Sequence, residues 1–181
     1  MLKKIALSGS CYWCMEAIFQ SLKGVIHVNQ GWVAEKSPPT DIDSQDTQQP
    51  FYEAIMVKYD SDIISADVLI DIHIHSHSST HRHPLRHRYP STVYTYTCDE
   101  QSAIRALLQQ KNAEFNGQLL TQAQIIGHFK PSQPNMQDYF YNNPDKPFCQ
   151  TIISPKLKKL LSEFGQWVTP EKTEQIHSHQ D

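Results

Sequence analysis

Apolar and polar residues follow two different periods along this chain, and together these predict a mixture of strands and helices. Strands are expected where apolar residues recur at every second position or form a short run between turn residues. Helices are expected where apolar residues recur three and four positions apart. The pattern predicts strands over residues 3–7, 25–33, 53–59, 92–97 and 122–128.

Three helices are predicted between these strands. The first follows Cys11 and ends before Gly24, the second has Ser65 as its N-cap and runs to about residue 74, and the third has Asp99 as its N-cap. Their apolar faces consist of Cys14, Ala17, Ile18 and Leu22 in the first, Val68, Leu69 and Ile72 in the second, and Ala103, Ile104, Leu107 and Leu108 in the third. This order is typical of an α+β fold, with helices covering a mixed sheet.

Length and composition narrow the class of protein. A chain of 181 residues with 39% hydrophobic residues is long enough for one globular domain with its own core. The net charge of −3 gives no reason to expect nucleic acid or membrane binding. No apolar run approaches the ~20 residues of a membrane-spanning helix, and the N-terminal run is too short for a signal peptide. We therefore expect a cytoplasmic protein. We also expect it to be a monomer.

Polar segments suggest where this domain ends. Residues 36–50 contain Pro38, Pro39 and Pro50 among polar residues, which predicts a surface loop. Residues 166–181 are mostly polar and are expected to form a frayed tail. The prediction is a single domain over residues 1–165, followed by a tail over residues 166–181.

Cys11 is the main candidate for chemistry, because it lies at a predicted corner between a strand and a helix. The free N–H groups and the dipole of a helix N-terminus stabilise a thiolate, which is the reactive form of cysteine. Tyr12 and Trp13 follow it and provide an apolar surface suited to a small apolar substrate group. The alternative is a buried structural cysteine, since free cysteines are often buried.

The four cysteines, Cys11, Cys14, Cys98 and Cys149, would be thiols in the cytoplasm. Redox chemistry or metal binding is therefore favoured over a framework of disulfides. Strand alternation places Glu53 on the same side as Ile55 and Val57. A carboxyl on the apolar side of a strand is a candidate general acid, because burial disfavours its charged form. The alternative is a solvated charge at the first residue of a strand.

Four segments, in order, resemble the type A peptide methionine sulfoxide reductases. The run Cys11-Tyr12-Trp13, followed by Glu16, Ala17 and Phe19, is similar to the family's Gly-Cys-Phe-Trp-Gly motif. The other matching segments are Tyr52-Glu53-Ala54, Arg88-Tyr89-Pro90-Ser91-Thr92-Val93-Tyr94, and Asn143-Pro144-Asp145-Lys146-Pro147-Phe148-Cys149. With Ser154-Pro155-Lys156-Leu157, the similarity extends from near Lys4 to near Phe164.

The resemblance implies a ferredoxin-like α/β sandwich with extensions and the reduction of methionine S-sulfoxide, free or in proteins. It implies that Cys11 is the nucleophile, that Glu53 is the acid, and that Tyr89 assists Glu53. Tyr12 and Trp13 would hold the methyl group of the substrate. The family binds no cofactor, and an external dithiol, thioredoxin, reduces the disulfide that forms.

The partner of Cys11 in that disulfide has two candidates. Cys149 matches the family's resolving cysteine and follows residues 142–147, which are rich in turn formers and are expected to move easily. Cys14 is the alternative, because Cys-x-x-Cys pairs at helix starts form disulfides. The predicted apolar face of the first helix points Cys14 toward the core, so we expect Cys149 to be the main partner.

The chain also departs from the family pattern. Cys14 replaces the usual glycine, although some members carry cysteine there, and Tyr12 replaces phenylalanine. Pro84 stands where the family has an aspartate. The segment that supplies a second active-site tyrosine in the family is replaced by Lys36-Ser37-Pro38-Pro39-Thr40-Asp41.

Histidines cluster ahead of Tyr89, at positions His73, His75, His77, His81, His83 and His87. Such a density suggests metal binding, and His73 and His77 have the spacing of one helix face. His77 aligns with a histidine of the family, and no further ligand spacing completes a set, so no physiological metal is expected. Two other functions remain open: a Cys-x-x-Cys thiol–disulfide oxidoreductase, and a non-catalytic metal-binding or sensor protein.

Overall fold

The fold is built on one mixed sheet whose first and last strands pair with each other. The computed structural model describes residues 1–36, 50–82 and 84–178. The strands in these residues are β1 (Leu2–Ser8), β2 (Val25–Glu35), β3 (Tyr52–Asp60), β4 (Thr92–Thr95) and β5 (Gln122–Pro131). Their order is β1-β3-β2-β5-β4, and β4 also pairs with β1, so that the sheet closes into a barrel. Only β4 and β5 run parallel; the other pairs are antiparallel.

The predicted mixed sheet and α+β class are confirmed, but the closed barrel differs from the expected ferredoxin-like sandwich. β5 pairs with β4 through residues 122–125 and with β2 through residues 126–131, and it thereby joins the two halves of the sheet. Register shifts at both ends of β2 accompany this closure, because bulges bend and twist a strand. The pattern of a single strand does not reveal such long-range pairing.

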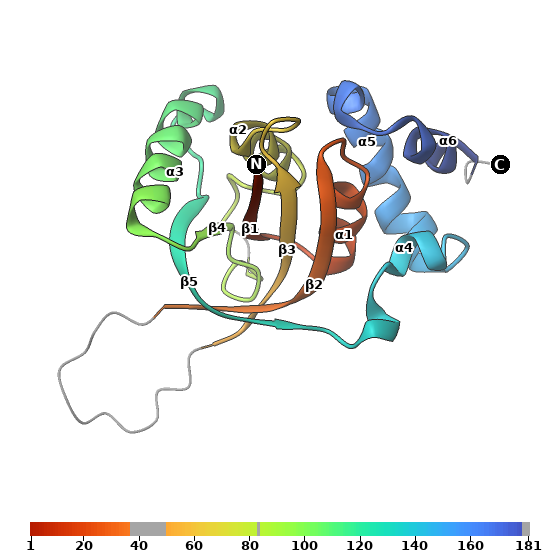
Figure 1. Ribbon diagram of the computed structural model, residues 1–181, viewed down its shortest axis with the longest axis horizontal. Coiled ribbons are helices and arrows are strands. Elements are labelled where there is room, and N and C mark those ends of the chain that lie inside the picture. Colours follow the sequence, from red (N-terminus) through yellow and green to blue (C-terminus); the bar gives the residue numbers. More distant parts are fainter. Residues whose placement is uncertain (37–49, 83, 179–181) are drawn as a thin grey trace.

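Six α-helices formed by the described residues pack around this sheet. They are α1 (Tyr12–Gln20), α2 (Ala66–His75), α3 (Cys98–Lys111), α4 (Tyr139–Asn142), α5 (Ser154–Phe164) and α6 (Pro170–Ser178). Figure 1 shows α3 alongside β5 at one side of the molecule, and α5 and α6 at the opposite side, beyond α1. A π-helical turn, Cys149–Ile153, leads directly into α5.

The three predicted helices exist, and one predicted N-cap is wrong. The Ser65 side chain accepts a hydrogen bond from the Val68 N–H and caps α2, as predicted. For α3 the cap is Thr97 instead of Asp99, because Thr97 and Glu100 form a reciprocal capping box. Asp99 lies in the first turn, where its charge is favourable. This early helix start also ends β4 at Thr95, two residues before the predicted end.

Alternate residues of the strands form two cores. The larger core lies between the sheet and the helices and contains Leu7, Ile55 and Val57 with apolar side chains of α1, α2 and α5. The smaller core consists of the residues in between, Ala6, Val33, Ala54 and Tyr94. Small alanines beside one large tyrosine fit the confined interior of a closed sheet.

The C-terminal segment is a packed helix instead of a frayed tail. Val168 forms a β-bridge with Leu22, and both side chains are buried. Ile176 in α6 is 0% exposed. The sequence did not predict this packing, because residues 166–181 are mostly polar and the two buried apolar residues, Val168 and Ile176, are eight positions apart. None of the helices in residues 1–36, 50–82 and 84–178 combines the length and the hydropathy of a membrane-spanning segment.

Candidate active site

Gly9 sets the position of Cys11. Its φ is +156°, and a Cβ at this position would lie 2.6 Å from Nε2 of His77, so only glycine fits between β1 and the histidine. The chain then turns, and Cys11 becomes the N-cap residue of α1. Its carbonyl accepts the N–H groups of Cys14 and Met15 at 3.1 and 3.2 Å. The half-buried Cys11 side chain thus lies at a helix N-terminus, as the sequence predicted.

The surroundings of Cys11 favour its thiolate. The thiol of Cys14 donates a hydrogen bond to Cys11, and this contact is the largest cause that lowers the pKa of Cys11 to about 7. The backbone N–H groups of Trp13 and Cys14 act in the same direction, whereas burial and the negative charge of Glu53 oppose it. The pKa of Cys14 is raised, because its proton is held in this contact and its side chain is buried. Of the two thiols, Cys11 is therefore the one whose thiolate is favoured.

Glu53 lies beside the first turn of α1. It is half-buried, at the end of the row of β3 residues that continues with Ile55 and Val57 in the core. Its Oε2 accepts the backbone N–H of Tyr12 at 3.2 Å, and its Oε1 accepts the hydroxyl of Tyr89 at 3.4 Å. The carboxyl group is therefore fixed one residue away from Cys11.

Tyr89 reaches Glu53 from the loop before β4. Arg86 donates a hydrogen bond to the Tyr89 carbonyl at 3.1 Å, and the guanidinium of Arg88 lies 5.4 Å from the centre of the Tyr89 ring. Burial and the nearby charge of Glu53 raise the pKa of Tyr89 above its usual value. Its hydroxyl therefore keeps its proton at neutral pH and acts as a donor.

A cleft of about 560 Å³ opens at this corner. Its lining comes from the start of α1, the end of α2, the loop before β4 and the segment that leads into α5. The lining residues are Gly9, Ser10, Cys11, Cys14, Ser76, His77, Ser78, Tyr89, Phe148, Ile152, Lys156 and Lys159. The cleft is large enough for a small substrate group to approach Cys11.

Tyr12 and Trp13 belong to an aromatic cluster beside Cys11. The Trp13 ring stacks on Tyr139, with 3.9 Å between ring centres and an angle of 6°. Its edge meets Phe148 at 5.9 Å, and Tyr12 contacts Trp32 of β2 at 5.6 Å. Sequence reasoning missed Tyr139. The aromatic run Tyr139-Phe140-Tyr141, just before the matched segment at Asn143, was the available signal.

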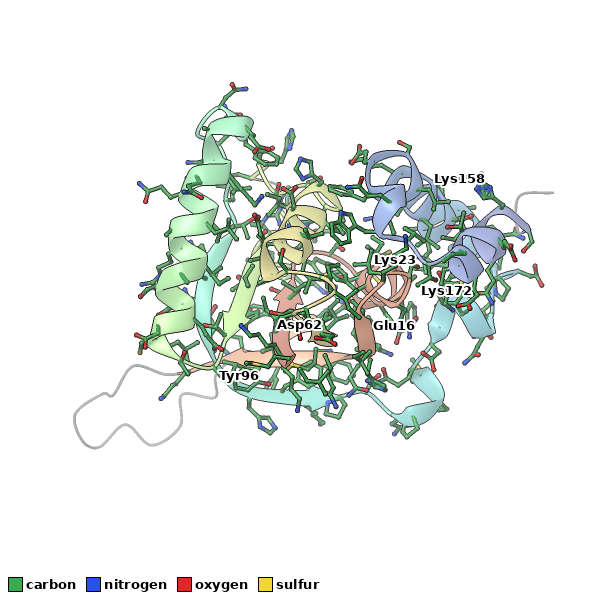
Figure 2. The ribbon with its side chains drawn as sticks, turned by 45° about the horizontal axis from the view of Figure 1, so that its top comes forward. Glu16, Lys23, Asp62, Tyr96, Lys158 and Lys172 are labelled. Carbon is green, nitrogen blue, oxygen red and sulfur yellow. The ribbon has the colours of Figure 1, made fainter. Side chains whose placement is uncertain are left out.

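Glu16 holds Tyr139 in place, and its role was also missed. Its side chain is 0% exposed, and Figure 2 labels it among the packed side chains of the interior. Its two oxygens accept the backbone N–H groups of Asp138 and Tyr139 at 3.0 and 2.9 Å. Burial raises the pKa of Glu16 to about 7, although these two hydrogen bonds oppose the shift. Glu16 therefore connects α1 to the segment that carries Tyr139.

The two candidate partners of Cys11 differ in their surroundings. Cys14 lines the cleft and is in contact with Cys11. Cys149 is 0% exposed and begins the π-helical turn before α5, shortly after the turn-forming residues 142–147. Its neighbours Phe148 and Ile152 line the cleft, and burial raises the pKa of Cys149. All four cysteines are free thiols, and Cys98 is exposed at the first residue of α3.

His73 and His77 are engaged by protein groups. His73 is fully buried, and its Nε2 donates to the Ser8 carbonyl at 2.8 Å. His77 lies beyond the end of α2, donates through Nδ1 to the His73 carbonyl at 2.6 Å and pairs through Nε2 with the Ser91 hydroxyl at 2.7 Å. Burial lowers the pKa of His73 to about 4 and that of His77 well below its usual value. Both side chains support the corner at Gly9 as neutral groups.

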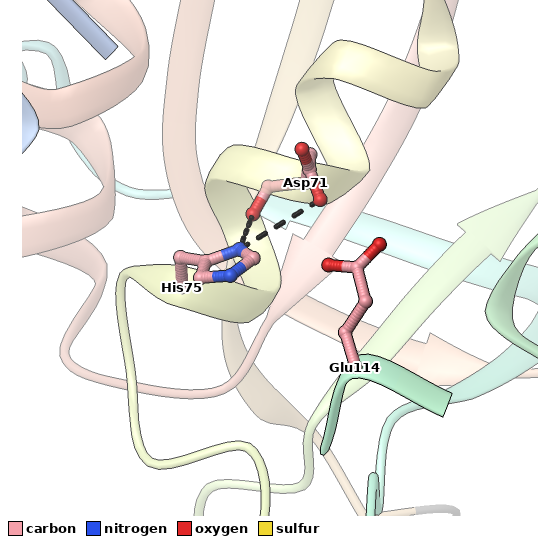
Figure 3. A group of neighbouring side chains, drawn as sticks. All are labelled: Asp71, His75 and Glu114. Atoms are coloured by element: carbon pink, nitrogen blue, oxygen red, sulfur yellow. Dashed lines mark hydrogen bonds and ion pairs between the residues drawn. The ribbon is translucent and has the colours of Figure 1, made fainter. Parts of the chain in front are cut away.

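A second group of possible metal ligands lies apart from the cleft. Figure 3 shows Asp71, His75 and Glu114, and one ligand atom from each lies within 4.8 Å of the others. The Lys111 ammonium is 3.0 Å from Asp71 Oδ1 and already supplies a cation. His75 Nδ1 donates to the Asp71 carbonyl at 2.8 Å. We therefore assign no metal to this group.

Two of the departures from the family pattern fall in or near undescribed segments. The replacement of the second tyrosine, at residues 36–41, lies almost entirely outside the described residues, and so does His83. Pro84 is exposed, in the turn before Tyr89. The carboxyl group that the structure places beside Cys11 is that of Glu53.

Comparisons with known proteins agree over most of the chain. A sequence model of the family described as peptide methionine sulfoxide reductase matches residues 3–167. Peptide methionine sulfoxide reductase MsrA of a Psychrobacter species is 32% identical over 176 residues, which cover 92% of this chain and 99% of the relative. The MsrA of a Nitratiruptor species is 27% identical over 173 residues, which cover 93% and 99%.

Solved structures share the fold. Methionine sulfoxide reductase A of Corynebacterium diphtheriae has a TM-score of 0.64 at 20% identity, covering 79% of this chain and 76% of that chain. The reduced form of Mxr1 from Saccharomyces cerevisiae has a TM-score of 0.63 at 18% identity, covering 82% and 89%. Mxr1 in complex with Trx2 has a TM-score of 0.52 at 15% identity, covering 73% and 81%.

Proposed function

This chain belongs to the peptide methionine sulfoxide reductase family, and we propose that Cys11, Glu53 and Tyr89 carry out the reaction of that family. The single observation that supports this assignment most is the pair of hydrogen bonds that fixes Glu53 between Tyr12 and Tyr89, one residue from a cysteine with a lowered pKa. The family match favours sulfoxide reduction over a Cys-x-x-Cys oxidoreductase and over a non-catalytic metal-binding or sensor protein.

The proposed first step transfers oxygen from the substrate to Cys11. The thiolate attacks the electrophilic sulfur of methionine sulfoxide. The Glu53 carboxyl is the proposed general acid, since its hydrogen bonds to Tyr12 and Tyr89 hold it one residue from Cys11. Glu53, assisted by the Tyr89 hydroxyl, gives a proton to the sulfoxide oxygen. Methionine leaves in its reduced form, and Cys11 is left as a sulfenic acid that holds the oxygen.

The substrate's methyl group is proposed to contact Tyr12 and Trp13. Trp13 stacks on Tyr139, and this contact positions its ring beside Cys11. Contacts between sulfur and aromatic rings favour such a position for methionine sulfoxide. The resemblance to the type A reductases implies the S epimer, either free or within a protein.

The second step forms a disulfide. A thiol attacks the sulfenic acid of Cys11, a disulfide forms, and the oxygen leaves as water. Cys149 is the partner that the resemblance implies, and its use requires the turn at Cys149–Ile153 to open, because the side chain is buried. Cys14 is the second candidate, favoured by its hydrogen bond to Cys11. A peptide map after one turnover without reductant distinguishes a Cys11–Cys149 from a Cys11–Cys14 disulfide.

The third step returns both cysteines to thiols through an external dithiol. We propose a thioredoxin-like protein as this reductant, with no bound cofactor in the enzyme. The solved complex of the yeast relative Mxr1 with Trx2 supports this choice. Exchange with the dithiol reduces the disulfide of the enzyme. The two electrons that the dithiol gives up equal the two that reduce one sulfoxide, so the cycle is complete.

The test is the reduction of dabsyl-methionine sulfoxide with dithiothreitol, measured for the native protein and for Cys11→Ser. The native protein should release dabsyl-methionine, and Cys11→Ser should be inactive while remaining folded, since a serine hydroxyl is a poor nucleophile here. Turnover by Cys11→Ser would contradict the proposal, and so would reduction of insulin disulfides in place of the sulfoxide.

A further inference from the structure

The charged residues that line the cleft at Cys11 are of one sign. Lys156 and Lys159 are its lysine residues, and among the described residues that line it none is Asp or Glu. His77 does not add a charge, because burial keeps its pKa well below the usual value. The chain as a whole carries 19 acidic and 16 basic residues. The rim of the cleft is therefore positive on a protein whose net charge is negative.

Both lysines lie on the same face of α5. They are three residues apart, which places their side chains one above the other on a helix. Lys156 is half-buried, and the ion pairs among the described residues do not include it. Lys159 donates to the His75 carbonyl at 3.0 Å, one residue before Ser76 of the lining. Glu163 approaches Lys159 only at 3.9 Å, and both side chains are solvent-exposed, so this pair is weak.

Arg88 adds a third positive group beside the cleft, although it does not line it. Glu53, which contacts the same Tyr89, is the acidic group there, and it is half-buried. The guanidinium of Arg88 lies over the ring of Tyr89, which lines the cleft. Like Lys156, it takes part in none of the ion pairs formed by the described residues. Methionine sulfoxide itself carries no charge on its side chain, so three cations around the cleft are not needed to bind it. Their position fits the residues that flank it in a polypeptide.

We propose that this cleft prefers methionine sulfoxide in acidic segments of proteins, with Asp or Glu near the sulfoxide contacting Lys156, Lys159 and Arg88. This inference rests on the proposed function and names the substrate class of the same site. Charged groups of one sign around a cleft raise the local concentration of ligands with the opposite charge. Each exposed pair contributes little alone, but three together give a preference of about tenfold.

The test is a binding measurement that does not require turnover. Calorimetry with the Cys11→Ser protein compares three peptides that contain one methionine sulfoxide each, flanked by Asp, by Ser or by Lys. We expect the Asp peptide to bind about tenfold more tightly than the Lys peptide at low salt, with the Ser peptide in between. The difference should shrink in roughly 0.5 M NaCl, because salt screens exposed charges. Equal affinities at low salt would overturn the inference.

Matched variants locate the effect. In the Cys11→Ser background, Lys159→Glu should remove most of the preference for the Asp peptide. Arg88→Gln, on the segment before β4, should reduce that preference to a smaller extent. Lys158→Glu is the control, because Lys158 is exposed on α5, does not line the cleft and changes the net charge equally; Figure 2 labels it. If Lys158→Glu and Lys159→Glu had the same effect, the preference would come from net charge, and the assignment to the rim would be wrong.

Turnover of free methionine sulfoxide by the native protein separates the two claims. If the native protein reduces free methionine sulfoxide but the peptides bind equally, only the preference for acidic segments fails. If it reduces no sulfoxide but the Asp peptide still binds preferentially through Lys159, the positive rim stands and the proposed reaction fails.

Discussion

Two carboxyl groups lie at the first helix, α1, and they differ mainly in exposure. Glu53 contacts the helix from β3, and Glu16 is part of it. Glu53 is half-buried beside the cleft and accepts one backbone N–H and one hydroxyl at 3.2 and 3.4 Å. Glu16 is fully buried and accepts two backbone N–H groups at 3.0 and 2.9 Å. Glu53 is loosely held and only half-buried, as its proposed role in proton transfer to a substrate requires. Tightly held and enclosed, Glu16 can only position the segment that it binds.

The largest expected effect is that of Glu53→Gln on the chemical step. Glutamine keeps the size of the side chain but cannot give a proton to the sulfoxide oxygen. We expect the rate of sulfoxide reduction in single-turnover experiments to fall by about 10²-fold or more, without loss of stability. The loss should be smaller at low pH, where solvent can supply the proton.

Glu35→Gln is a matched control, because Glu35 is another half-buried carboxyl group, at the end of β2. The rate of sulfoxide reduction by Glu35→Gln should stay within about twofold of the native rate, since a substitution away from the cleft has little effect. A native rate in Glu53→Gln would show that Glu53 is only a strand-end charge and would remove the contrast with Glu16.

The second prediction concerns stability and the buried member of the pair. Because the pKa of Glu16 is raised to about 7 in the folded protein, the folded state binds more protons than the unfolded state between about pH 4.5 and pH 7. The free energy of unfolding should therefore decrease as pH rises through this window. We expect this decrease to be on the order of 2 kcal/mol.

The comparison of urea unfolding for the native protein and Glu16→Gln at pH 5 and pH 8 isolates this contribution. Glutamine does not ionise, so the variant should lack the part of the decrease that comes from Glu16. Glu53→Gln serves as the control and should keep that part. The same pH slope in the native protein and in Glu16→Gln would show that Glu16 does not titrate in this range.

The contrast between these carboxyl groups also shows what the sequence could and could not predict. Local patterns predicted the strands, the start of the first helix at Cys11 and the side of the strand on which Glu53 lies. They did not distinguish Glu16 from an ordinary exposed glutamate, because its burial depends on Asp138 and Tyr139, more than 120 residues away. A hydrophobic period of two or 3.6 residues describes a single strand or helix, and it carries no information about contacts between residues far apart in the sequence.

The same limit explains the other differences between prediction and structure. Closure of the sheet depends on β5 pairing with both β4 and β2. The C-terminal helix depends on Val168 and Ile176 finding apolar partners in the rest of the chain. Similarly, the burial of Cys149 in a helical turn depends on packing that the turn-forming residues before it do not predict. In each case, tertiary contacts decided the outcome.

The third prediction extends the comparison to the two thiols of the first helix. Cys11 is half-buried and favours the thiolate, whereas Cys14 is buried, keeps its proton and donates a hydrogen bond to Cys11. Cys14→Ala removes this donor, which is the largest cause of the lowered pKa of Cys11. We expect the pKa of Cys11 to rise by about one unit, which reduces the thiolate fraction at neutral pH by several-fold.

The rate of Cys11 alkylation by iodoacetamide as a function of pH measures this change. Mass spectrometry of the peptide that contains Cys11 separates it from the other thiols. Cys98→Ala, which removes an exposed cysteine at the start of α3, should leave the midpoint near pH 7. An unchanged midpoint in Cys14→Ala would mean that the helix N-terminus alone stabilises the thiolate.

The smallest expected effect is that of Tyr89→Phe, and it sharpens the account of Glu53. The hydrogen bond from Tyr89 to Glu53 is long, at 3.4 Å, so its loss should reduce the rate of sulfoxide reduction only by about three- to tenfold. If both groups act on the same oxygen, the rate of the Tyr89→Phe, Glu53→Gln double variant should fall by less than the product of the two single reductions in rate.

Tyr96→Phe is the control, since the Tyr96 hydroxyl contacts Met56 instead. Fully multiplicative losses would show that Tyr89 and Glu53 act independently, and Tyr89 would then be a wall of the cleft instead of a partner in proton transfer.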